Sequence, residues 1–148
     1  MNLTRALPVK LLMLVCMSFA LAACGSEKEE SEGERGEAFG TVCEMTQLSG
    51  DTGLPQDFPI TGDVVFVKSE EAGPSLIVEG YAEGELEDVY DEWHSAFESS
   101  NYEITFDERE DHDAEISFEG GGQSGQVKLA DECGDGRIYV RVTARPTE

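Results

Sequence analysis

The feature that most constrains this fold is a change of hydrophobic period near residues 99–101. Before the change, apolar residues recur at helical spacing, and after it they alternate with polar residues. Alternation gives a strand one apolar and one polar face, so these segments are expected to form an antiparallel sheet with one buried face. The alternating apolar positions are Tyr102, Ile104, Phe106, Ala114, Ile116, Phe118, Val127, Leu129, Ile138, Val140 and Val142.

Residues 85–98 predict one amphipathic helix. Their apolar positions fall at i, i+3, i+4, i+7, i+10 and i+11, which places them on a single helix face. Acidic residues fill the opposite face, and those in the first turn suit the helix dipole. The apolar stripe consists of Leu86, Val89, Tyr90, Trp93, Ala96 and Phe97.

Two further strands are predicted before the helix, at 63–68 and 75–82, with a turn over 70–74. Glycine-rich segments at 120–125 and 132–136 predict hairpin connections. The expected fold class is therefore α+β, an antiparallel sheet in ββαββββ order with one amphipathic helix packed across it. This order of elements is similar in outline to that of helix-grip domains.

The segment 54–60 contains two prolines, which favour extended backbone in the residues before them. Leu54, Phe58 and Ile60 can then point to one side, and we expect an extended strap that packs on the domain edge. The alternative is a ligand for a proline-reading module.

The N-terminus has the three parts of an export signal. Residues 1–10 carry Arg5 and Lys10 and no acid, and residues 11–23 form an apolar run. That run is too short for a comfortable permanent membrane span. Small residues then precede a cysteine.

Leu21, Ala22, Ala23 and Cys24 match every position of the lipobox, so the N-terminus resembles that of bacterial membrane lipoproteins. The resemblance implies cleavage between Ala23 and Cys24, removal of residues 1–23, and a diacylglyceryl group on the Cys24 sulfur, usually with acylation of the new amino terminus. In an organism with two membranes, Gly25 lacks the Asp retention mark of the family, which implies the outer membrane facing the periplasm. A plain signal peptide and an uncleaved helix are the alternatives.

Residues 24–38 are expected to be a lipidated cysteine followed by an acidic, disordered tether, because residues 25–37 contain no large apolar side chain. The single folded domain is expected over 39–148.

The net charge of −22 comes from 32 acidic and ten basic residues. Such a chain should be repelled by nucleic acid and by anionic lipid headgroups. The acids are spread along the chain, which favours adaptation to salt. The other interpretation is a site for cations or for a basic partner.

Four cysteines are present. Cys16 lies in the signal and Cys24 is the lipid site, which leaves Cys43 and Cys133. In an oxidising compartment these two are expected to form a disulfide, with a pair of free thiols as the alternative.

Enzyme motifs are weak in this sequence. Gln126 stands where a nucleophile elbow needs its last glycine, and His94 and His112 lack zinc-binding spacing. The acidic stretch 107–113 is expected to join two strands. Its carboxylates, Asp107, Asp111 and Asp113, are candidate cation ligands, and a solvated hairpin tip is the alternative reading.

The expected function is a non-enzymatic, lipid-anchored envelope protein that presents one acidic domain for protein contact or envelope assembly. The alternative is a lipoprotein that binds a cation or small ligand through the 107–113 loop or the open sheet face; hydrolase activity is a third possibility. We expect no cofactor, contact with the membrane through Cys24, an envelope protein as partner, and no nucleic acid.

Overall fold

The computed structural model describes residues 41–61 and 63–147. The predicted order of two strands, one long helix and four strands is confirmed, with a further short helical turn at 41–43. The elements are β1 Val64–Ala72, β2 Ser75–Glu83, α2 Leu86–Glu98, β3 Glu103–Arg109, β4 Asp113–Gly120, β5 Gln123–Ala130 and β6 Arg137–Pro146. The predicted signal peptide and tether, residues 1–38, lie outside the described residues. No helix in the described ranges is both long and apolar enough to span a membrane.

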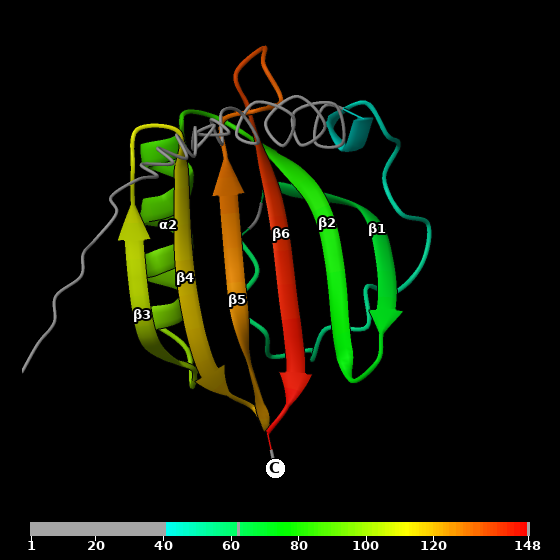
Figure 1. Cartoon of the computed structure of the whole chain (residues 1–148), viewed down its shortest axis with the longest axis vertical. Coiled ribbons are helices and arrows are strands. Elements are labelled where there is room, and N and C mark those ends of the chain that lie inside the picture. The colour runs from blue at the N-terminus through cyan, green and yellow to red at the C-terminus, as the bar shows by residue number, and fades with distance from the viewer. Residues whose placement is uncertain (1–40, 62, 148) are drawn as a thin grey trace, which may run out of the picture.

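All six strands form one antiparallel sheet in the order β1-β2-β6-β5-β4-β3 (Figure 1). Helix α2 covers one face of this sheet, behind β3 and β4 in the view of Figure 1. The helix buries its apolar stripe against the inward side chains of the central strands, as the two periodicities predict. The helix contributes Leu86, Val89, Tyr90, Trp93 and Phe97, and the sheet contributes Val78, Ile116, Phe118, Val127, Leu129, Val140 and Val142.

Phe58 lies at the centre of an aromatic cluster between helix and sheet. Its ring centroid is 5.2 Å from that of Phe118, 5.4 Å from that of Tyr102 and 5.8 Å from that of Phe97. The expectation of an extended strap on the domain edge was therefore wrong here. The Phe58 amide donates to the Pro55 carbonyl and closes a turn, which inserts the ring into the core.

The chain before Phe58 runs along β1 from one sheet face to the other (Figure 1). The Leu48 amide donates to the Phe66 carbonyl at 2.8 Å, and the Ser69 hydroxyl donates to the Thr52 carbonyl at 2.6 Å. The first bond occupies a backbone carbonyl on the outer edge of β1 that would otherwise be open to strand pairing, and the second holds the passing segment beside that edge.

Both edge strands contain a β-bulge, one between Phe66 and Lys68 and one between Ile104 and Phe106. A bulge adds one residue to one strand and reverses the alternation after it. Phe106 was expected on the buried face beside Ile104, and this expectation was wrong. The bulge turns Phe106 to the opposite face, where it is 50% exposed.

A second, smaller core lies on the sheet face opposite α2, which we call the open face. Here Val42 packs on Val67, Ala130 and Tyr139, all buried. The sequence pattern predicted a solvated face throughout, which was wrong for Tyr139.

The predicted disulfide between Cys43 and Cys133 is confirmed, with a Cα–Cα distance of 5.5 Å. It joins the segment that covers this second core to the connection between β5 and β6. The Arg137 guanidinium adds a hydrogen bond of 2.6 Å to the Cys43 carbonyl. The covering segment is therefore fixed to the sheet by a covalent bond and a charged donor.

Replacing Phe58 by alanine should lower the free energy of unfolding by about 3–5 kcal/mol, because it empties the centre of the aromatic cluster. Urea unfolding followed by tryptophan fluorescence would measure the change. Ile60→Ala is the matched control, since Ile60 is 41% exposed and its loss should cost about 0.5 kcal/mol or less. Equal effects of the two substitutions would contradict this placement of Phe58.

Candidate functional site

The open face gathers most of the described cations. Strand register places five Lys and Arg side chains on it, while Arg109 faces the helix and pairs with Glu87 and Asp91. Acidic residues dominate the outer surface of α2. The two sides of the domain therefore differ in charge, although the chain as a whole is acidic. The five residues on the open face are Lys68, Lys128, Arg137, Arg141 and Arg145.

One row of charged side chains crosses the whole open face, with one member from each strand. Cross-strand neighbours on one face lie about 5 Å apart, so the members interact in sequence across the sheet. Positive and negative charges alternate along only part of the row, because two cations are neighbours on β6 and β5. In spatial order its members are Lys68, Glu79, Arg141, Lys128, Glu115 and Glu108.

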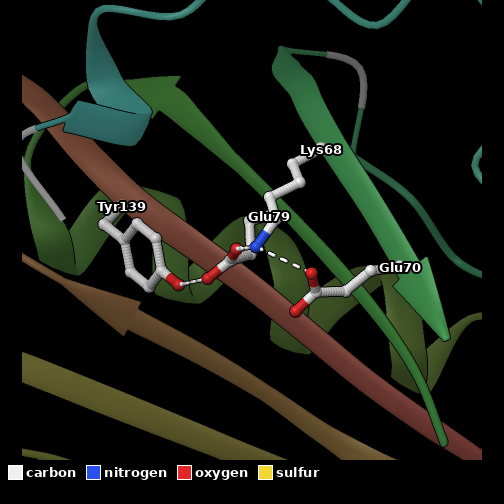
Figure 2. Close-up of polar contacts among 4 residues, drawn as sticks. All are labelled: Lys68, Glu70, Glu79 and Tyr139. Carbon is white, nitrogen blue, oxygen red and sulfur yellow. Dashed lines mark hydrogen bonds and ion pairs between the residues drawn. The ribbon is translucent and has the colours of Figure 1, made fainter. Parts of the chain in front are cut away.

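The part of this row with the most hydrogen bonds lies around Glu79 (Figure 2). The Tyr139 hydroxyl donates to Glu79 Oε1 at 2.5 Å, and the Lys68 ammonium donates to Glu79 Oε2 at 3.1 Å. Lys68 also pairs with Glu70 at 3.0 Å. Tyr139 is fully buried and the Glu79 side chain is only 13% exposed. The charged row is therefore joined to the second core through one carboxylate.

The local environment shifts the pKa values of these groups away from neutral pH. Burial raises the pKa of Glu79, but the hydrogen bonds from Tyr139 and Lys68 more than offset it, so the pKa lies below its ordinary value. Burial, followed by the bond to Glu79, raises the pKa of Tyr139. On the helix side, burial and the hydrogen bond to Asp107 raise the pKa of Tyr90 to about 12. These groups hold fixed protonation states at pH 7.

The next row across the open face is mostly uncharged. It begins with Glu70, and its other members run from an aliphatic side chain through hydroxyl and amide groups to an exposed aromatic ring. In spatial order they are Ile77, Thr143, Gln126, Ser117 and Phe106. No described segment crosses this part of the face, which we call the uncovered end, in contrast to the covered end around Tyr139.

A shallow groove of about 350 Å³ lies on the uncovered end. Its lining carries hydroxyl and amide groups from Ser75, Thr105, Ser124, Gln126 and Thr143.

Two charged side chains, Arg145 and Glu119, also line the groove. Among the described residues the Arg145 side chain has no ion-pair or hydrogen-bond partner, unlike those of Lys68 and Lys128, which pair with carboxylates. The groove is therefore polar and close to neutral in local charge, and it offers donors that the fold itself does not use. The sequence pattern identified the polar face but not this groove, because only strand order brings β2, β6, β5, β4 and β3 together.

The candidate cation ligands are separated by the sheet. The stretch 107–113 is not one loop, since β3 continues to Arg109 and β4 begins at Asp113. Asp107 faces the helix and accepts from Tyr90 at 2.7 Å, whereas Asp113 lies on the open face, 3.4 Å from Lys128. Asp111 is exposed in the turn. Within the described chain, no three His, Cys, Asp or Glu side chains are placed to hold a metal ion.

The other residues named from the sequence have separate positions. His94 lies on α2 with Nδ1 3.6 Å from Glu98, and the backbone carbonyl of His112 accepts from the Asp131 amide. Ala23 and Cys24 lie outside the described residues. The structure thus joins Cys43 with Cys133 and brings none of the other candidates together.

Replacing Tyr139 by phenylalanine should lower the free energy of unfolding at pH 7 by about 1.5–3 kcal/mol, the usual worth of a hydrogen bond to a charged group. Because folding lowers the pKa of Glu79, this contribution is complete above the ordinary Glu value of about 4.3 and is lost as the pH falls through the folded value. Urea titrations from pH 7 to pH 3 would measure it. Tyr81→Phe is the control and should cost about 0.5 kcal/mol or less. A difference between wild type and Tyr139→Phe that stays constant down to pH 3 would contradict the contact.

Comparisons with protein-family models, with curated proteins and with solved structures found no match for this chain. Its function is therefore inferred from the contacts, charges and exposure of the described residues together with the N-terminal sequence.

Proposed function

We propose that this chain is an exported, lipid-anchored envelope protein whose domain works by contact with another envelope component and not by catalysis. The lipobox ending in Cys24 supports the anchor. The disulfide between Cys43 and Cys133 supports export, since such bonds persist in oxidising compartments. In an organism with two membranes, Gly25 favours the outer membrane, facing the periplasm.

The main support for a contact role is the polar groove on the uncovered end of the open face. The described chain enters the domain at the covered end, where residues 41–43 pack over Tyr139 (Figure 2). The groove is lined by Ser124 and Arg145, at the other end of the strands. Figure 1 marks the C-terminus at that end of β6. β6 has ten residues and so a length of about 33 Å. An anchor attached before residue 41 would leave the groove at the end of the strands that is distant from its point of attachment.

The pKa shifts of Lys68, Glu79 and Tyr102 favour structural roles for these groups over proton transfer. A catalytic acid or base works best with a pKa near the operating pH. Here the pKa of Lys68 is raised by its hydrogen bonds to Glu70 and Glu79, and that of Glu79 is lowered. Burial raises the pKa of Tyr102 as well. Each shift moves its group further from neutrality and fixes it as a structural donor or acceptor.

The proposed lipid anchor predicts the mass of the mature protein. Intact-mass analysis of the protein purified from membranes should show the loss of residues 1–23 and the addition of a diacylglyceryl group at Cys24. Cys24→Ser should abolish the addition and leave the protein uncleaved or released from the membrane fraction. An unmodified Cys24 in the native protein would overturn the anchor, whatever the domain binds.

The contact role predicts protection of the groove in the envelope. A cysteine at Ser124, in the groove lining, should react with a small maleimide several-fold more slowly in isolated envelopes than in detergent, because the bound component blocks access. Ser95→Cys, on the exposed surface of α2, is the matched control and should react equally in both.

Equal labelling of Ser124→Cys in envelopes and in detergent would contradict contact through the open face. Slower labelling of both variants in envelopes would indicate restricted reagent access rather than binding, and would also count against a specific contact.

A further inference from the structure

We propose that the groove on the uncovered end of the open face binds an uncharged glycan strand. The proposal rests on the contact role above and names the class of the component. Phe106, which follows the lining residue Thr105 on β3 and lies just outside the lining, would supply a stacking surface beside one end of the groove. The row of hydroxyl and amide side chains would bind the sugar hydroxyls.

The position of the groove excludes recognition through the protein backbone. Its centre lies on β6, β5 and β4, and each of these strands is paired on both sides. Their backbone donors and acceptors are therefore already used in the sheet. A peptide that binds by strand addition needs a free sheet edge. Only side chains are therefore free to recognise a ligand in this groove.

The side chains available are those that suit a polyhydroxylated ligand. Thr143 and Ser124 hydroxyls donate and accept, and the Gln126 amide does both through separate atoms. Sugar hydroxyls have the same dual character, so each can be satisfied by such a set. The groove offers no deep apolar pocket for an acyl chain or a large hydrophobic side chain; Phe118, which also borders it, is 1% exposed.

The charge of the groove favours a ligand without net charge. Its lining contains one cation, Arg145, and one carboxylate, Glu119. At long range an anion would be repelled by the net negative charge of the chain, and in the groove it would have to approach Glu119. A cation would have to approach the unpaired Arg145. An uncharged glycan meets neither penalty and can use both groups as hydrogen-bond partners.

Phe106 and the length of the groove fit a chain of sugars. Phe106 is 50% exposed and lies in the same cross-strand row as Thr143 and Gln126. A sugar ring has a flat apolar face, and such a face can pack on the face of an aromatic side chain. From Ser75 on β2 to Thr105 on β3 the groove crosses four strand spacings, roughly 19 Å. That span exceeds one sugar ring and calls for an oligosaccharide.

The test uses the mature lipidated protein, which begins at Cys24, in nanodiscs of zwitterionic lipid. Calorimetric titration with a fully acetylated chitin hexamer and with cellohexaose should give saturable binding of at least one of them. The Kd should change by about twofold or less between 0.05 M and 0.5 M NaCl, because no net charge is neutralised. Phe106→Ala should weaken binding by about tenfold or more, and Thr143→Val by about fivefold.

Ile60→Ala is the control, since it removes a comparably exposed apolar side chain outside the groove, and it should leave the Kd unchanged. Absence of binding by both glycans would overturn the proposal. Tighter binding of poly-glutamate or of an oligogalacturonate, with steep salt dependence, would assign the groove to an acidic partner and overturn it as well.

The two proposals fail in different ways. Protection of Ser124→Cys in envelopes without glycan binding would keep the contact role and reject the glycan. Loss of protection together with absence of glycan binding would reject both.

Discussion

The structure depends on one covalent constraint, the bond between Cys43 and Cys133. It holds the segment that begins at residue 41 against one end of the open face, where Tyr139 and its neighbours are buried. The sequence separation of 90 residues gives a stabilisation of about 4–5 kcal/mol in the chain-entropy model. The same bond divides the open face into a covered and an uncovered end.

From this constraint the chain passes around β1 to the helix side, where Phe58 fills the aromatic cluster. Consecutive parts of one segment thus contribute to the cores on both faces of the sheet. Glu79 links the covered end to the charged row, and its bonds to Tyr139 and Lys68 keep it ionised. Beyond that row the polar side chains make fewer contacts with the rest of the domain. The groove lies in this region.

Much of the fold could be predicted from the sequence. The spacing of Trp93 and Phe97 specified the helix, and the alternation through Val140 and Val142 specified the sheet, because period alone separates the two structures. Phe106 could not be placed, since a one-residue bulge at Thr105 reverses the alternation without leaving a composition signal. The second core was missed, although the aromatic ring of Tyr139 on a nominally polar face was a visible sign.

The candidate site was less predictable than the fold. A cation site at 107–113 assumed that neighbouring carboxylates converge, but a hairpin sends Asp107 and Asp113 to opposite faces of the sheet. The groove depends on residues that are distant in sequence, such as Ser75 and Arg145, and only strand order brings them together.

The most direct test of the central claim is hydroxyl-radical footprinting of the native protein in intact envelopes and after extraction. Oxidation of Phe106 should slow several-fold in envelopes, while oxidation of Met45, which is 39% exposed on the covering segment, should stay the same. Equal oxidation of Phe106 in the two states would show that the uncovered end meets only solvent, and would contradict the account.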